Sequence, residues 1–460
     1  MNKLLDISLV EIAKLYRQKE VSPVHVTKLL FERQKHLEPM LNAFIEVREQ
    51  AAIKQAHIVE RQFLNNEALN ILAGIPYTSK DLFFEMNELT TCGSRILKDN
   101  KPEYSATVLN KLSQTHAILV GKTNMLEFAY GVVHPDFGKT NNPWDITKTS
   151  GGSSSGSAAA VASGIGYFSL GTDTGGSIRI PAAYCGTVGL KPTRGLVSTY
   201  GVFPLSWSLD HVGPITRTVI DAAVVLDVIA GYDPKDRYSV VGKISALNFE
   251  KFGADTKNKR VGILPNEMLK KLKVDVRKIY DSTLVQMRLL GWDLVEIQIQ
   301  DWDRTEELIL NVLLPEAAHI HQKWFDRKDD YTETTYKQIE LGMQHRAVDY
   351  INSLEHLNWY KESVSDLFNQ VDLIMTPTVA FEAPAEDPVI GSEELDEMMY
   401  TGPFNISGHP AVTLNMGYTE NGLPVGIQLV APHFQDMELL QAAYQLEQTQ
   451  SIKLPQIIPV

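Results

Sequence analysis

The chain has 460 residues and a formal net charge of −13, and 44% of its residues are hydrophobic. This acidic balance argues against a nucleic acid as the main partner, since binding to a phosphate backbone rests on clustered lysines and arginines. The two cysteines, Cys92 and Cys185, cannot brace a chain of this length with disulfides, so a reducing, cytoplasmic location is expected.

The first 65 residues are expected to be helical. Leu9, Ile12 and Tyr16 recur at helical spacing, and Ser22 followed by a proline is typical of a helix start. Acidic residues interrupt the first 20 positions, so no secretory signal is expected there. We predict that residues 1–65 pack on a core formed by residues 66–460, and that the two parts make a single domain.

From residue 71 onward, short apolar runs alternate with helical stretches. Residues 260–297 show the pattern well, because they predict a strand, a helix and a second strand. Alternation of this kind predicts an α/β fold with a mixed central β-sheet and helices on both faces. Residues 380–400 are rich in acidic residues and proline and predict a surface loop.

Residues 149–172 form an uncharged run of 24 residues, which by length alone would span a bilayer. Thirteen of them are glycine or serine, and these lack the apolar surface that insertion requires. No membrane segment is therefore expected, and the run needs another explanation. It contains no phosphate-binding loop, because no G-x-x-x-x-G-K-[ST] pattern occurs in or near it.

Residues 152–156 match the G-x-S-x-G pattern, which makes Ser154 a candidate nucleophile on a strand-to-helix elbow. Such an elbow needs a strand before it, whereas residues 142–150 resemble a turn-rich loop. A flexible linker is the other interpretation of the run. The helix-forming residues 158–162 argue against it.

A second glycine-serine cluster, residues 171–181, has two consecutive glycines directly before Ser177. Glycines there allow backbone N–H groups to converge beside the serine oxygen. Acyl-transfer sites stabilise a developing oxyanion in this way. This cluster therefore favours Ser177 as a nucleophile, with the first cluster supplying a partner.

Together these clusters resemble the amidase signature enzymes. The similarity extends to residues 74–81 (GIPYTSKD), 121–127 (GKTNMLE), 191–195 (KPTRG) and 423–429 (LPVGIQL), and so covers most of the chain. It implies the amidase signature fold and a hydrolase that cleaves a carboxylic amide to a carboxylate and ammonia or an amine.

The resemblance also implies the residues of the site. Ser177 matches the nucleophile that forms the acyl-enzyme, Ser153 the relay serine in an unusual cis peptide bond after Gly152, and Lys80 the base. The remaining matched residues belong to the oxyanion hole: Thr174, Gly175, Gly176 and the N–H of Ser177. No metal or cofactor is implied.

The role of Lys80 makes a physical demand on its surroundings. A lysine acts as a base only when it is neutral. A working pKa near 7 to 8 lies about 3 pH units below that of a free lysine, which corresponds to about 4 kcal/mol. Burial without a carboxylate partner produces such a change. The local sequence alone favours a solvated ion pair between Lys80 and Asp81.

Other titratable residues near these motifs have structural interpretations. Asp173 and Arg179 bracket Ser177 and either bind substrate or, as we prefer, form an internal ion pair. Glu316, with His319 and His321, has the residue types of a metal site but lacks a third well-spaced ligand, so a helix surface or pocket wall is favoured. Cys185 is expected to be a buried small apolar residue.

Within the family, the main alternative is the glutamine-hydrolysing A subunit of the tRNA-dependent amidotransferase. The glutamine-binding aspartate of that protein is replaced here by Met398 or a neighbour, and its substrate-binding arginine by Lys337 or Gln338. We therefore predict a less polar small-molecule amide as substrate and no ammonia-accepting partner. Two other functions stay possible: a urea- or carbamate-cleaving enzyme and an inactive scaffold of the same fold. The protein also stays a candidate homodimer.

Overall fold

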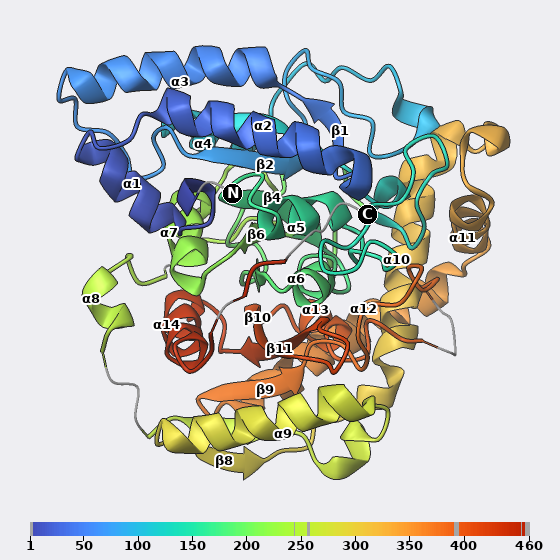
Figure 1. The fold of residues 1–460 in the computed structure, drawn as a ribbon. Coiled ribbons are helices and arrows are strands. Elements are labelled where there is room, and N and C mark those ends of the chain that lie inside the picture. The colour runs from blue at the N-terminus through green and yellow to red at the C-terminus, as the bar shows by residue number, and fades with distance from the viewer. Residues whose placement is uncertain (1–2, 243, 255–257, 391–394, 452, 456–460) are drawn as a thin grey trace.

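The computed structural model describes residues 3–242, 244–254, 258–390, 395–451 and 453–455. Within these ranges, 11 strands form one sheet in the order β1-β3-β2-β4-β6-β5-β10-β11-β9-β7-β8. The strands pair in both directions: β2 is parallel to β3 and β4, whereas β6 is antiparallel to β4 and β5. Helices surround this mixed sheet (Figure 1), so the predicted α/β fold is confirmed.

The strands have the following bounds: β1 Phe44–Val47, β2 Pro76–Lys80, β3 Ile118–Thr123, β4 Phe168–Asp173, β5 Val188–Lys191, β6 His211–Thr216, β7 Arg260–Ile263, β8 Asp293–Glu296, β9 Leu373–Pro377, β10 Ala411–Tyr418 and β11 Pro424–Val430. The α-helices have these bounds: α1 Leu9–Arg17, α2 Pro23–Leu41, α3 Glu49–Leu64, α4 Thr107–Gln114, α5 Ser155–Ala162, α6 Arg179–Cys185, α7 Val219–Ile229, α8 Phe249–Phe252, α9 Val274–Leu289, α10 Thr305–His321, α11 Glu333–Met343, α12 Ala347–Leu367, α13 Gly402–Ile406 and α14 Asp436–Glu447.

The first 65 residues are largely helical, as predicted, but not throughout. Asn42 ends α2 in a left-handed conformation, and the chain then enters strand β1, which pairs antiparallel with β3 at the edge of the sheet. The residues of β1 (FIEV) are mostly aromatic or β-branched, and such residues favour strands over helices. The N-terminal segment is therefore joined to the core by sheet hydrogen bonds. The boundary at residue 65 stays a prediction.

The uncharged run of residues 149–172 lies entirely in the interior. Its middle part forms α5, which packs on β2, β3 and β4. Gly156 lies so close to the backbone of Ala43 and Asn124 that a Cβ atom there would clash with both. Small residues thus bring the helix against neighbouring backbone, which explains the composition of the run. Among the described residues, no helix has the length and apolarity needed to cross a membrane.

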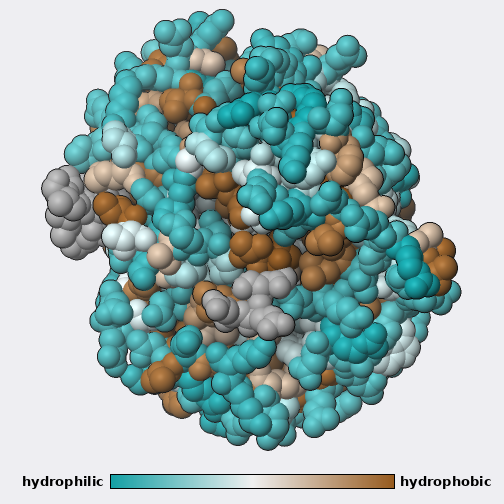
Figure 2. Space-filling model, turned by 90° about the vertical axis from the view of Figure 1, so that its right-hand side faces the viewer, coloured by the Kyte–Doolittle hydropathy of each residue, from teal (hydrophilic) through white to brown (hydrophobic). Residues whose placement is uncertain are grey.

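Residues 260–297 form the predicted strand, helix and strand as β7, α9 and β8, and the two strands are parallel. Residues 380–390 and 395–400 contain no helix or strand, in agreement with the predicted loop, whereas residues 391–394 lie outside the described part. The loop is not confined to the surface, since Phe381 and Tyr400 are buried. Figure 2 shows a largely hydrophilic face with hydrophobic residues gathered near its centre.

Candidate active site

The site lies where neighbouring parallel strands end. Lys80 is the last residue of β2, and Asp173 is the last residue of β4. Because these strands are parallel, both residues lie at the same edge of the sheet, where open α/β sheets bind their ligands. Ser153 and Ser177 lie in the loops that lead into α5 and α6. The N–H of Ser154 donates to the carbonyl of Ser177 at 3.3 Å and ties the two loops together.

Lys80 is fully buried and is held by two hydroxyl groups. Its Nζ lies 2.7 Å from Oγ of Ser153 and 2.9 Å from Oγ1 of Thr172. Burial lowers the pKa of Lys80 to about 7, although the charges of Asp173 and Asp210 act in the opposite direction. A large fraction of Lys80 is therefore neutral near pH 7 and able to accept a proton.

The neighbouring carboxylate does not pair with Lys80. Asp81 instead lies 2.6 Å from Nζ of Lys122, and its second oxygen accepts hydrogen bonds from the N–H and hydroxyl of Thr91. Lys80 has no ion-pair partner among the described residues. A solvated Lys80–Asp81 pair, which the local sequence favoured, is thus contradicted by the burial and pairing of both side chains.

The two serines differ in exposure. Ser153 follows a cis peptide bond after Gly152, as the resemblance implied, and is only 1% exposed. Ser177 is the one residue between 149 and 185 that is not buried, and its hydroxyl makes no hydrogen bond to a described residue. Ser153 is therefore the partner of Lys80, whereas the hydroxyl of Ser177 is accessible to a substrate.

Residues 174–177 form a loop with free backbone donors. The N–H groups of Gly175, Gly176 and Ser177 have no acceptor among the described residues. Gly176 has a φ of 144°, a conformation that favours glycine. The loop is held by Thr174, whose hydroxyl donates to Asp210 at 2.7 Å, and by Thr401, whose hydroxyl donates to the carbonyl of Gly175 at 2.6 Å. Unpaired donors are rare in protein interiors, so this loop is suited to hold an oxyanion.

An internal ion pair lies next to the loop of residues 174–177. Arg179 donates to both oxygens of Asp173 at 2.9 Å, and both side chains are fully buried. Asn405 completes the cluster by donating to Asp173 at 2.8 Å. Burial alone would raise the pKa of Asp173, but the Arg179 guanidinium holds it well below its usual range. These two residues therefore form the internal pair that we preferred from the sequence.

Sequence reasoning missed Thr172, which contacts Lys80, and Asp210, which contacts Thr174. Asp210 also accepts hydrogen bonds from the N–H groups of Leu205 and Ser206 at 3.0 and 3.1 Å. Burial raises its pKa to about 6, although these hydrogen bonds act in the opposite direction. Asp210 thus fixes the loop that precedes β6 to the predicted oxyanion loop.

Glu316, considered above with two histidines as a metal site, has a structural role. It accepts hydrogen bonds from the hydroxyl of Ser206 at 2.6 Å, from the N–H and hydroxyl of Ser208, and from the hydroxyl of Tyr350 at 2.8 Å. His321 contacts the hydroxyl of Tyr331, and burial lowers its pKa to about 3. The described residues contain no group of side chains suited to hold a metal ion.

The residues considered for substrate recognition differ in position. Lys337 is 63% exposed and pairs with Glu333, so it does not face the interior. Gln338 is buried, and its Oε1 has no partner among the described residues. The sulfur of Met398 packs on Gly175 so closely that a Cβ there would lie 2.5 Å from it. Met398 therefore forms part of the wall beside the predicted oxyanion loop.

Comparisons with known proteins agree over nearly the whole chain. Residues 25–440 match the family described as "Amidase". The chain is 37% identical to a Glutamyl-tRNA(Gln) amidotransferase subunit of Acaryochloris marina (strain MBIC 11017), over 94% of this chain and 95% of the relative.

Solved structures are similar over the same extent. A structure described as "Crystal structure of amidase" superposes with a TM-score of 0.85 at 31% identity, covering 97% of this chain and 100% of the other. Another, from work on a vestigial protein complex and the origins of an s-triazine catabolic enzyme, has a TM-score of 0.90 at 27% identity, with the same coverage of both chains.

Proposed function

Because the chain belongs to the amidase family and is a hydrolase of C–N bonds, we propose that it cleaves a carboxylic amide through an acyl-enzyme on Ser177. Lys80 is the base and Ser153 the proton relay. The observation that carries this proposal is the state of Lys80, which is fully buried, lacks a carboxylate partner and lies 2.7 Å from the hydroxyl of Ser153.

The reaction follows from the positions of these groups. Neutral Lys80 accepts the proton of Ser153, which accepts the proton of Ser177 as the Ser177 oxygen attacks the amide carbon. The oxyanion accepts hydrogen bonds from the free N–H groups of residues 175–177. The relay then returns a proton to the leaving nitrogen. Water attacks the acyl-enzyme by the same route and releases the carboxylate.

The walls of the site favour an uncharged acyl group. Met398 packs on Gly175, and it or a neighbour stands where the amidotransferase has its glutamine-binding aspartate. The thioether of Met398 does not neutralise the ammonium group of glutamine. A charged group left without a partner in such a site costs several kcal/mol. Aliphatic or aryl amides are therefore the proposed substrates.

The glutamine-hydrolysing protein of the amidotransferase is the second candidate, because curated relatives at 33 to 37% identity carry the amidotransferase name. In this case the substrate is glutamine and a partner protein receives the ammonia. The two candidates share the chemistry at Ser177 and differ in acyl group and partner.

Both candidates are tested by trapping the acyl-enzyme. The purified protein is mixed with a panel of aliphatic and aryl amides and with glutamine, quenched in acid and analysed by mass spectrometry. We expect an aliphatic or aryl acyl group on the peptide that contains Ser177. A glutamyl adduct, together with strong glutaminase activity or copurification of a second protein, would instead establish the amidotransferase function.

Two variants provide the controls. Ser177→Ala is expected to abolish the adduct, whereas Ser154→Ala is expected to retain it, since the Ser154 hydroxyl donates to the carbonyl of Thr172 at 3.3 Å. Labelling with a fluorophosphonate separates an active enzyme from an inactive scaffold. Wild type that fails to label, or labelling that survives Ser177→Ala, contradicts the proposed nucleophile.

A further inference from the structure

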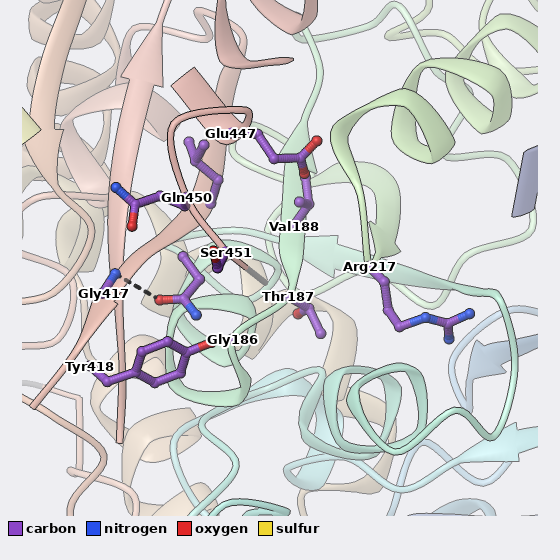
Figure 3. A pocket seen from close by; sticks show the side chains of 11 residues that line it. Gly186, Thr187, Val188, Arg217, Gly417, Tyr418, Glu447, Gln450 and Ser451 are labelled. Carbon is purple, nitrogen blue, oxygen red and sulfur yellow. Dashed lines mark hydrogen bonds between the residues drawn. The ribbon is translucent and has the colours of Figure 1, made fainter. Parts of the chain in front are cut away.

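Several cavities lie outside the catalytic residues, and two of them differ in what they can hold. The smaller lies beside the ends of β5 and α14 (Figure 3) and has a volume of about 20 Å³, which suits one water molecule. The larger has a volume of about 490 Å³, which is the size of a ligand pocket. It is bordered by α12, the end of α13 and four loops. We call it the α12 cavity, lined by Arg194, Ser208, Tyr238, Val240, Leu354, Leu357, Asn358, Lys361, Ile406, Ser407, Gly408, His433 and Phe434.

The α12 cavity carries positive charge without a matching carboxylate. Arg194 and Lys361 line it, no aspartate or glutamate does, and neither cation forms an ion pair with a described residue. The carboxylates that influence Arg194, Glu316 first among them, do not line the cavity. Glu316 is already satisfied by Ser206, Ser208 and Tyr350, as described above. A cation with no carboxylate partner, facing a pocket, is suited to bind an anion.

Two hydrogen-bond donors at this cavity lack partners. Ser407 is fully buried and its Oγ has no hydrogen bond to a described residue. The Nε of Arg194 is buried and equally unpartnered, although its Nη2 donates to the carbonyl of Trp207 at 3.1 Å. Buried donors without acceptors are costly, and each such group in a protein calls for an explanation. An anionic acceptor between Arg194 and Ser407 would satisfy both.

The electrostatic potential in the α12 cavity is positive, like the charges of Arg194 and Lys361. His433 donates from Nε2 to the carbonyl of Ser407 at 3.0 Å. Burial, together with the positive charges of Lys361 and Lys191, lowers the pKa of His433 to about 4. The remaining walls are mostly apolar, with Leu354 and Leu357 from α12 and Phe434 from the loop before α14.

From this arrangement we propose that the α12 cavity binds a small organic carboxylate. Its charged group contacts Arg194 and Ser407, Lys361 lies at the same cavity, and its apolar chain packs on the α12 leucines and Phe434. This site is separate from the catalytic residues, and none of Lys80, Ser153 and Ser177 lines it.

The cavity is also connected to the proposed oxyanion loop. Ser208 lines the cavity, and Arg194 holds the carbonyl of the adjacent Trp207. Two residues further along the chain, Asp210 accepts the hydroxyl of Thr174. A carboxylate on Arg194 therefore acts on the segment that positions Thr174. This regulatory consequence rests on the proposed function, whereas binding itself does not.

The binding test uses the full-length Ser177→Ala protein, so that turnover and acyl transfer play no part. Hexanoate is titrated by calorimetry, with 1-hexanol as the neutral chain and inorganic phosphate as the anion without a chain. Hexanoate is expected to bind at least about tenfold more tightly than either, because only it offers both a charge and a chain. Equal binding of hexanol, or tighter binding of phosphate, contradicts the proposal.

Substitutions show where the ligand binds and distinguish binding in the α12 cavity from binding beside Ser177. Ser407→Ala removes an unpartnered hydroxyl, so it should not lower the melting temperature, yet it should weaken hexanoate binding about tenfold. Arg194→Lys keeps the charge but loses the guanidinium donors and should weaken binding by a similar factor. Lys35→Gln, at an exposed lysine paired with Glu49, is the control and should change nothing.

A spectroscopic signature completes the test. The anion should raise the pKa of His433, measured as a shift in the titration of its imidazole proton resonance. Unchanged affinity in both Ser407→Ala and Arg194→Lys, or an unchanged His433 titration at saturating hexanoate, would overturn the assignment. If the proposed catalysis fails but these binding results hold, the cavity assignment stands on its own.

Discussion

Lys80 and Lys122 are both fully buried and lie on neighbouring parallel strands, yet their surroundings differ. Lys122 has a carboxylate at 2.6 Å, and its Nζ also donates to the carbonyl of Leu89 and the hydroxyl of Thr90. Lys80 has only two hydroxyl groups. Burial without a carboxylate lowers the pKa of Lys80, as its proposed role as a base requires, whereas Lys122 is held in a buried ion pair with Asp81.

The difference arises from a single carboxylate one residue further along the chain. Asp81 directly follows Lys80 in a turn at the end of β2, where its N–H donates to the carbonyl of Thr123, the residue after Lys122, at 3.2 Å. The carboxylate therefore faces Lys122 rather than its sequence neighbour. The Lys80-Asp81 dipeptide thus leaves Lys80 without a counterion and provides one for Lys122.

The largest effect is expected from Lys80→Met. The variant should lose about 10²–10⁴-fold in kcat/KM, because the general base is gone. Its melting temperature should be unchanged or higher, since a buried amine without a carboxylate is replaced by an apolar side chain. Amide hydrolysis and thermal unfolding measure the two quantities. A large loss of stability together with retained activity would reverse the assignment of the two lysines.

Lys122→Met should produce the opposite pattern. Removing this cation leaves the Asp81 carboxylate buried and unpaired, which costs about 3–5 kcal/mol of unfolding free energy. Denaturant unfolding measures the loss. The double variant Lys122→Met with Asp81→Asn should recover part of it, because the unpaired charge is then absent. If the double variant recovers no stability, the loss in Lys122→Met does not come from an unpaired Asp81 carboxylate.

The pH dependence of stability sharpens the comparison further. The folded pKa of Lys80 is about 7 and its ordinary value is 10.5, so between these values the unfolded chain binds more protons than the folded one. Stability contributed by this group therefore rises with pH, by about 2 kcal/mol between pH 7 and 9. Unfolding of wild type minus Lys80→Met, measured at both pH values, isolates this term. A difference that falls with rising pH would contradict the depressed pKa.

The smallest effect is expected from Thr172→Val, which removes one acceptor from the Lys80 ammonium group. A lost hydrogen bond to the charged form lowers the pKa, so the acid limb of the kcat/KM profile should move to lower pH by less than about 1 unit. Activity near pH 8 should remain close to wild type. The control is Thr78→Val, also buried, whose hydroxyl has no partner among the described residues. A shift toward higher pH would exclude Thr172 as a ligand of the ammonium.

The sheet type and the α9 unit could be predicted from the sequence, because alternating periodicity is a local signal. The roles of Lys80, Ser153 and Ser177 came from the family resemblance and stay predictions, since the local sequence around Lys80 favoured a solvated ion pair. Thr172 and Asp210 could not be found in this way. Thr172 contacts a residue 92 positions away, and its only signal is its place at the end of a strand parallel to β2. Strand β1 was missed because four residues between two helices carry little periodicity.

The residues of the proposed reaction and the residue that forms a wall of the site come from different halves of the chain. Lys80, Ser153 and Ser177 all lie in the first half of the chain, whereas Met398, which packs on Gly175, comes from the second half. The later half also carries Thr401 and Asn405, which hold Gly175 and Asp173, so exchange of this half between homologues would change the support of the proposed reaction centre together with its wall. A new wall therefore has to spare these supporting contacts if the proposed reaction is to be kept.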